Sequence, residues 1–183
     1  DPTDITLPGT QQKLLRAVHA TGNPVVLVLM TGSAIDVSWA QANLPAIVLA
    51  WYPGQQGGNA IADVLFGDTN PSGRLPVTFY RSVDQLPPFA DYGMANRTYR
   101  YFTGDPLYPF GHGLSYARFE YSDFRVDRAE VGSGDALEAS VAVKNAGAVA
   151  GAEVVQLYAR HVAPKLAQPR QQLRGFERVA LAP

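Results

Sequence analysis

The stretch Trp51-Tyr52-Pro53-Gly54-Gln55-Gln56-Gly57-Gly58 joins an apolar run to a helical pattern. Ala46–Ala50, which precedes it, is continuously apolar and has the length of a buried strand. Gln55–Phe66 places its apolar residues on one helical face, and Gly67 can end that helix in a left-handed conformation. The stretch is therefore predicted to be the turn of a strand–turn–helix unit.

The residues before this unit repeat the same pattern. Val25–Met30 is apolar without alternation, which is typical of a strand covered on both faces in a parallel sheet. A helix is expected from Thr10, whose side chain can cap it, and a short crossover helix is expected over Ile35–Ala42. Residues 10–67 thus predict an α/β fold with an open, mostly parallel sheet flanked by helices.

The two turns that follow the predicted strands are the candidate substrate site. In open α/β sheets, ligands bind beyond the carboxyl ends of the strands. Here those ends are followed by a polar turn and an aromatic pair, so the predicted lining residues of a substrate pocket are Thr31, Gly32, Ser33, Trp51 and Tyr52.

Residues 68–118 are rich in proline, glycine and aromatic residues and show no sustained periodicity. A segment of this length is expected to be an ordered connection laid over its neighbours rather than a simple linker. The alternation in Arg97–Phe102 suggests a short strand within it. The predicted organisation is an α/β domain over 1–80, a connector over 81–118 and a further domain over 119–183.

The last part of the chain has a β pattern. Strands are expected over Phe119–Val126, over the alternating residues from Leu137 to Val143, and over Gln172–Val179. Val154–Tyr158 is expected to be the return strand of the alternating segment. Short antiparallel strands indicate a β-sandwich, which needs roughly 100 residues in its seven-stranded form. The domain is therefore predicted to be partial, with the chain ending partway through it.

Composition excludes several classes of function. The chain has 15 basic and 16 acidic residues and a net charge of -1, which gives no electrostatic basis for binding nucleic acid or an anionic membrane. It has no cysteine, which excludes disulfides, thiolate nucleophiles and zinc–cysteine sites. No apolar run approaches the roughly 18 residues of a membrane span. Because the sequence starts without methionine, a fragment or processed piece is expected, with any export signal outside it.

Motif searches identify no catalytic or cofactor site. His19, His112 and His161 lack the close spacing of metal ligands, and Ser115 lies in an incomplete nucleophile elbow. Gly54–Gly58 precedes a helix as an anion site does, yet it matches no phosphate motif, so close helix–sheet packing is favoured over a nucleotide or anion site. No pair of carboxylates stands out as an acid and a nucleophile. The sequence therefore predicts no catalytic residue, no metal and no cofactor in this chain.

The aromatic and basic run Arg97–Phe102 admits two interpretations. Its rings can stack on sugars, which suggests a non-catalytic carbohydrate-binding or interaction module in which Tyr99 is needed. The commoner explanation is packing between domains. Asn96-Arg97-Thr98 is a glycosylation sequon, meaningful only in a eukaryotic secreted protein.

Five motifs, in order along the chain, closely resemble those of the family 3 glycoside hydrolases. They are Asp4–Gln11, Trp51–Gly67, Asn70–Thr78, Tyr108–Tyr116 and Asn145–Tyr158. The resemblance covers essentially the whole chain, and the run Arg97–Phe102 looks like the β-xylosidase and β-glucosidase branch.

The resemblance implies an exo-acting, retaining β-glycosidase that acts on terminal β-D-xylosyl or β-D-glucosyl residues. Such enzymes pair an N-terminal barrel, which carries an aspartate nucleophile, with an α/β domain and often a fibronectin type III-like domain. Their acid/base glutamate precedes a segment that is similar to Asp1–Asp4, with Pro2 where arginine is common. Both catalytic carboxylates are thus expected outside this chain, whose partners would be the barrel and an oligosaccharide or aryl β-glycoside. A periplasmic or extracellular location is expected.

Overall fold

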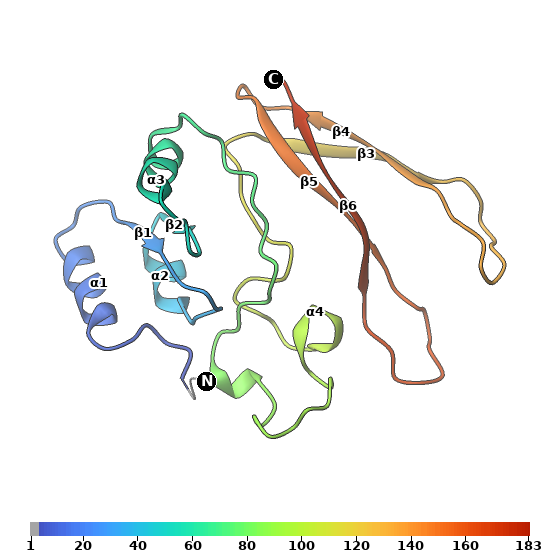
Figure 1. Cartoon of the computed structure of the whole chain (residues 1–183), viewed down its shortest axis with the longest axis horizontal. Coiled ribbons are helices and arrows are strands. Elements are labelled where there is room, and N and C mark those ends of the chain that lie inside the picture. The colour runs from blue at the N-terminus through green and yellow to red at the C-terminus, as the bar shows by residue number, and fades with distance from the viewer. Residues whose placement is uncertain (1–3) are drawn as a thin grey trace.

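The computed structural model describes residues 4–183 and begins with a small α/β unit (Figure 1). Helix α1 spans Gln11–His19 and is followed by strand β1, Val26–Leu29. After α2, Ser38–Asn43, and β2, Ala46–Leu49, helix α3 spans Gly57–Phe66. The α-β-α-β-α order predicted over residues 10–67 is confirmed.

The sheet of this unit is smaller than the sequence pattern suggested. β1 and β2 pair in parallel, with Leu27 opposite Ile47 and Leu29 opposite Leu49, and no third strand joins them within residues 4–183. Full coverage of β1 is also not observed, because Val26 is 44% exposed and Met30 67%. The expected open, mostly parallel sheet is therefore present here only as one parallel strand pair with its helices.

Local backbone chemistry explains where the helices end. Gly67 follows α3 at φ 86°, the left-handed conformation expected for it. Thr10 precedes α1, but its side chain makes no capping hydrogen bond, so that expectation is wrong. Gly57 is buried at the start of α3, where an added Cβ would lie 2.6 Å from the Cγ of Pro53. This glycine-rich turn is therefore too closely packed to accept a side chain at position 57.

The core joins the α/β unit to the segment that follows it. Phe79 and Leu107 are 2% and 4% exposed and pack into the same apolar cluster as Leu29 and Val37. Burying a side chain of this size stabilises the fold by about 1.5–3 kcal/mol. A bridge between Phe79 and Tyr108 closes residues 80–107 into a loop.

The connector contains two short helical turns instead of a strand. A 3-10 turn, η1, spans Val83–Gln85, and α4 spans Thr98–Tyr101. The strand expected over Arg97–Phe102 is therefore wrong. The backbone amides of Tyr101 and Phe102 donate to the carbonyls of Arg97 and Thr98, so these residues satisfy their hydrogen bonds locally and have no partner strand.

The C-terminal part forms two antiparallel hairpins, in which every expected strand is present. β3, Phe119–Val126, pairs with β4, Ala139–Asn145; β5, Gly151–Ala159, pairs with β6, Gln172–Leu181. The expected pairing of Val154–Tyr158 with the alternating segment is wrong, since β5 takes β6 as its partner. The alternation of β4 correctly indicated one wetter face, but alternation does not specify which strand lies alongside.

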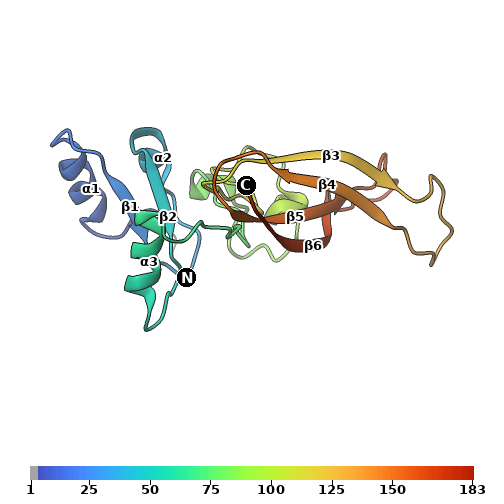
Figure 2. The same cartoon turned by 90° about the horizontal axis from the view of Figure 1, so that it is seen from above.

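The molecule is elongated, with the α/β unit at one end and the hairpins at the other (Figure 1). Figure 2 shows α1 beside β1 at the outer edge of the α/β unit, and the connector between this unit and the hairpins. Among residues 4–183, no helix has the length and apolar character needed to cross a membrane.

Candidate functional site

The two turns predicted to line a site lie in contact beyond the strand ends. The pairing continues one residue past the strands, because the Ala50 amide donates to the Leu29 carbonyl at 2.8 Å. The ring of Tyr52 then lies against Gly32, where an added Cβ would come within 2.6 Å of the tyrosine Cζ. Any side chain at position 32 would displace this ring.

The aromatic pair at the end of β2 divides into a packed residue and an exposed one. Trp51 adopts φ 51° and turns its indole towards the core, where it meets Phe79 edge-on at 6.5 Å between ring centroids. Tyr52 is 80% exposed. Tyr52 is therefore the one of the two whose ring is available to an incoming molecule.

Thr31 and Ser33 form a small hydroxyl turn after β1. The Thr31 hydroxyl and the Ser33 backbone share hydrogen bonds of 3.3–3.4 Å. Both residues line a mainly apolar groove of about 660 Å³ between β1, α1 and residues 4–8. Gly32, Trp51 and Tyr52 are not part of that groove, so the five predicted residues fall on two adjoining surfaces.

The carboxylates of the described chain do not form a catalytic pair in a cleft. Among residues 4–183, Glu153 is the one buried carboxylate, and no cluster of three metal-ligating side chains occurs. Asp63 is exposed, while Asp36 is half-buried and accepts the Ser38 amide at 2.8 Å. The segment Asp1–Thr3, for which the resemblance implied a neighbouring acid/base loop, lies outside the described residues.

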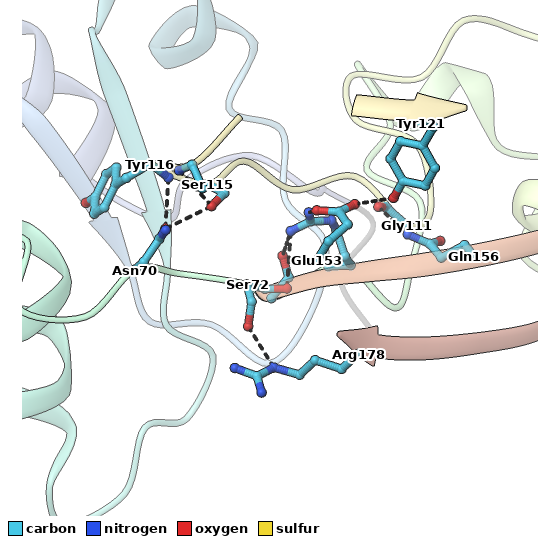
Figure 3. Close-up of polar contacts among 12 residues, drawn as sticks. Asn70, Ser72, Gly111, Ser115, Tyr116, Tyr121, Glu153, Gln156 and Arg178 are labelled. Atoms are coloured by element: carbon cyan, nitrogen blue, oxygen red, sulfur yellow. Dashed lines mark hydrogen bonds and ion pairs between the residues drawn. The ribbon is translucent and has the colours of Figure 1, made fainter. Parts of the chain in front are cut away.

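Glu153 belongs to a buried ionic contact that sequence reasoning missed. Its Oε2 lies 2.5 Å from Nη2 of Arg74, and both side chains are only 11% exposed (Figure 3). Its Oε1 accepts the Tyr121 hydroxyl at 2.7 Å. Burial raises the pKa of Tyr121, and the hydrogen bond to Glu153 raises it further. The only feature of the sequence that could have indicated this ion pair is a charged residue, Glu153, within the otherwise uncharged strand Gly151–Ala159.

Asn70 and Ser72, in the same motif as Arg74, make hydrogen bonds to the connector and to the hairpin region. The Asn70 side-chain oxygen accepts from the Ser115 hydroxyl and the Tyr116 amide (Figure 3). Its side-chain nitrogen donates to the Ala150 carbonyl. Arg178 on β6 donates to the Ser72 hydroxyl at 3.1 Å. These residues fix the hairpins against the α/β unit, which is a structural role.

The aromatic run that suggested sugar binding is largely packed. Tyr99 stacks on Phe110 at 4.2 Å between centroids and contacts Tyr158 edge-on, and its hydroxyl accepts the Leu173 amide. The structure thus favours the packing interpretation for Tyr99. Asn96 of the sequon is half-buried; its side chain donates to the Gln85 carbonyl and accepts the Thr103 amide.

His112 is similarly part of a packed turn. Its ring stacks on Tyr108 at 4.9 Å between centroids. Burial lowers the pKa of His112, and the nearby charge of Arg74 lowers it further. His112 is therefore a packing residue of this turn.

Comparison with known proteins matches two stretches of the chain to family models. Residues 1–116 match the glycosyl hydrolase family 3 C-terminal domain, and residues 153–183 match a fibronectin type III-like domain. The chain therefore belongs to the family of glycosyl hydrolase family 3 C-terminal domains.

Similar proteins are named as glycosidases. A xylan 1,4-beta-xylosidase from Xylanibacter ruminicola is 48% identical over 98% of this chain, and a periplasmic beta-glucosidase from Salmonella typhimurium is 43% identical over 99%. The structure of a β-glucosidase from Erythrobacter marinus matches the whole chain at 46% identity and a TM-score of 0.87. The chain spans 20% and 25% of the two curated relatives and 24% of the solved structure.

Proposed function

We propose that this chain is the C-terminal part of an exo-acting, retaining β-glycosidase that hydrolyses terminal β-D-xylosyl or β-D-glucosyl residues. The observation that carries the proposal is the alignment of nearly the entire chain with proteins named β-xylosidase and β-glucosidase, at 48% and 43% identity. In this proposal the chain has an α/β domain over 1–80, a connector over 81–118 and a fibronectin type III-like region over 119–183. A periplasmic or extracellular location accompanies it, supported by the name of the Salmonella relative.

The chemistry of such an enzyme requires two carboxyl groups about 5–5.5 Å apart. One attacks the anomeric carbon, while the other protonates the leaving oxygen and then activates water. Glu153 is unsuited to either role, because Arg74 and Tyr121 occupy both of its oxygens. In our proposal both carboxylates therefore come from a preceding barrel domain and its adjoining loop.

In this proposal the chain supports the catalytic domain and positions residues beside it. The turns Thr31–Ser33 and Trp51–Tyr52 face the barrel, since they follow the carboxyl ends of the parallel strands. Tyr52, exposed and resting on Gly32, is the residue most available to contact a substrate.

The proposal is tested with the full-length protein and two aryl substrates, a β-D-xyloside and a β-D-glucoside. We expect hydrolysis of at least one, with proton NMR showing the β-anomer of the released sugar first. Release of the α-anomer would contradict the retaining mechanism, and no hydrolysis of either substrate would contradict the proposed activity.

A further inference from the structure

The hairpin formed by β5 and β6 carries an unbalanced positive charge around its loop. Residues 154–176 contain four basic residues and no aspartate or glutamate; the basic residues are Arg160, Lys165, Arg170 and Arg174. All four are exposed. None of them belongs to the ion pairs present among residues 4–183. These four residues form the basic loop cluster.

Strand pairing brings two members of the cluster to the same end of the loop. The pairing of β5 with β6 reaches Ala159 opposite Gln172, so residues 160–171 form a loop whose ends are closed. Arg160 lies directly after this last pair, and Arg170 lies two residues before it. Their positive charges therefore enter and leave the loop side by side.

The other two members lie on either side of this point. Lys165 is in the middle of the loop, and Arg174 is the additional residue at a bulge in β6, where it has no partner residue on β5. The four positive charges thus follow one another along a single hairpin and act together on an anionic ligand.

The end of the loop is anchored to α4. The Arg170 amide donates to the Arg100 carbonyl at 2.6 Å, and the Arg170 guanidinium donates to the Phe102 carbonyl. The Tyr99 hydroxyl accepts the Leu173 amide at 3.1 Å. Because a carbonyl carries no net charge, these bonds order the base of the loop without neutralising Arg170. An ordered base reduces the conformational entropy that is lost when a ligand binds.

The other hairpin has the opposite charge at its loop. Residues 127–138, which join β3 to β4, contain four carboxylates and one arginine. The loops of the two hairpins project separately from the molecule (Figure 1). The net charge of -1 for the whole chain therefore conceals a local positive region that can attract an anionic ligand.

The arrangement of the cations indicates a polymeric anion. Arg170 lines a cavity of about 140 Å³ beside Tyr99, and the other three members of the cluster do not, so one small anion would not contact all four. A ligand that engages the whole cluster must carry several anionic groups along its length. Three of the four cations are arginines, whose planar guanidinium groups bind carboxylates in a bidentate geometry.

Two classes of polyanion fit this region less well than an acidic polysaccharide does. Residues 159–175 contain no tryptophan, tyrosine or phenylalanine, the side chains that anchor proteins at a membrane interface. Nucleic-acid-binding domains are strongly basic as a whole, whereas this chain has a net charge of -1. A polysaccharide with uronate carboxylates at intervals along its chain matches a row of separate cations.

We propose that the basic loop cluster binds an acidic polysaccharide through its uronate carboxylates. The inference goes beyond the proposed function, because it concerns attachment to a polymer and involves no bond cleavage.

The test measures binding of the full-length protein to beads that carry polygalacturonate, a polymer of uronate units, and to beads that carry the same polymer with its carboxylates reduced to alcohols. We expect saturable binding to polygalacturonate and none to the reduced polymer. The variant Arg160→Gln/Lys165→Gln/Arg174→Gln should bind polygalacturonate about tenfold more weakly, because three charge-assisted contacts are lost. Arg170 is left in place, since it bonds to the end of α4.

A matched control removes three exposed cations from other parts of the chain. Lys13→Gln/Arg125→Gln/Lys144→Gln changes the net charge by the same amount and should bind polygalacturonate as the wild type does. Equal weakening in the two triple variants would overturn the assignment to the basic loop cluster, as would equal binding to the reduced polymer or no binding to either.

Two further probes separate a polysaccharide from other polyanions. Binding of the wild type to poly-glutamate, or to phosphatidylglycerol vesicles, as tightly as to polygalacturonate would overturn the assignment to a saccharide. Hydrolysis of the aryl β-glycosides is measured separately, and its absence in the wild type would overturn the proposed function while leaving the binding result in place.

Discussion

At the scale of single residues, the ion pair between Arg74 and Glu153 is the most consequential contact between the α/β unit and the hairpins. Both side chains are only 11% exposed, and Tyr121 completes the hydrogen bonding of the carboxylate. Removing one partner leaves a buried charge without compensation, which is far more destabilising than loss of a surface pair.

Arg74→Ala should therefore lower the free energy of unfolding by about 3 kcal/mol. The matched control is Arg81→Ala, which breaks a pair with Asp105 whose side chains are 44% and 85% exposed and should cost less than about 1 kcal/mol. Urea unfolding of both variants measures the difference. Equal losses would show that the Arg74 pair is no more important than a surface contact.

His112 gives stability a defined dependence on pH. Its pKa is lowered in the folded protein from a usual value of 6.5, mainly because the stacked ring is partly buried. The unfolded chain therefore binds a proton at a higher pH than the folded chain does. Stability from the neutral ring is present above pH 6.5 and is lost as pH falls through the folded pKa.

We expect the melting temperature to fall between pH 7.5 and pH 5, and to fall less in His112→Phe, which keeps an aromatic ring against Tyr108 but cannot be protonated. His161→Gln, a change at an exposed histidine, serves as the control for removing a histidine. The same slope in wild type and His112→Phe would rule out His112 as its source.

At the scale of elements, the turn between β2 and α3 depends on one glycine and not on its neighbour. A Cβ at Gly57 would meet Pro53 at 2.6 Å, whereas a Cβ at Gly58 would have nothing within 4 Å. Both residues lie in the first turn of α3 and neither has positive φ.

Gly57→Ala should destabilise the protein by about 1–3 kcal/mol through overpacking. Gly58→Ala should instead be neutral or stabilising by up to about 1 kcal/mol, because alanine favours the helix. Thermal unfolding of the two variants provides the comparison. A Gly57→Ala protein as stable as Gly58→Ala would mean that Pro53 yields without cost.

Elements with strong local signals were predictable from sequence. α3 has a helical apolar face and ends at Gly67, and β3 has the predicted bounds Phe119–Val126. The strand predicted over Arg97–Phe102 was wrong because alternation is typical of a strand, but this segment has no neighbouring strand to pair with. The pairing of β5 with β6 was not predictable either, because a periodic pattern shows which face is buried but not which strand lies beside it.

The candidate site was predictable only in outline. Strand order placed Gly32 and Tyr52 at the same edge, and the structure shows them in contact. The ion pair of Arg74 with Glu153 joins residues 79 positions apart, and no spacing rule predicts such a contact. The anchoring of the loop after β5 likewise depends on the carbonyls that Arg170 reaches, which sequence does not show.

At the scale of the whole molecule, the described chain is an elongated support that contains no catalytic pair. Hydrogen bonds of Arg74, Asn70 and Ser72 join the α/β unit, the connector and the hairpins into one assembly (Figure 3). In the function proposed above, the catalytic carboxylates therefore come from another domain.

The most direct test of this account is the initial rate of aryl β-glycoside hydrolysis by the isolated chain, by the isolated preceding barrel segment, and by the two expressed together. The account predicts no turnover by the chain alone and recovery of activity when both parts are present, because the proposed carboxylates lie outside residues 4–183. Turnover by the isolated chain at the rate of the full-length protein would contradict it.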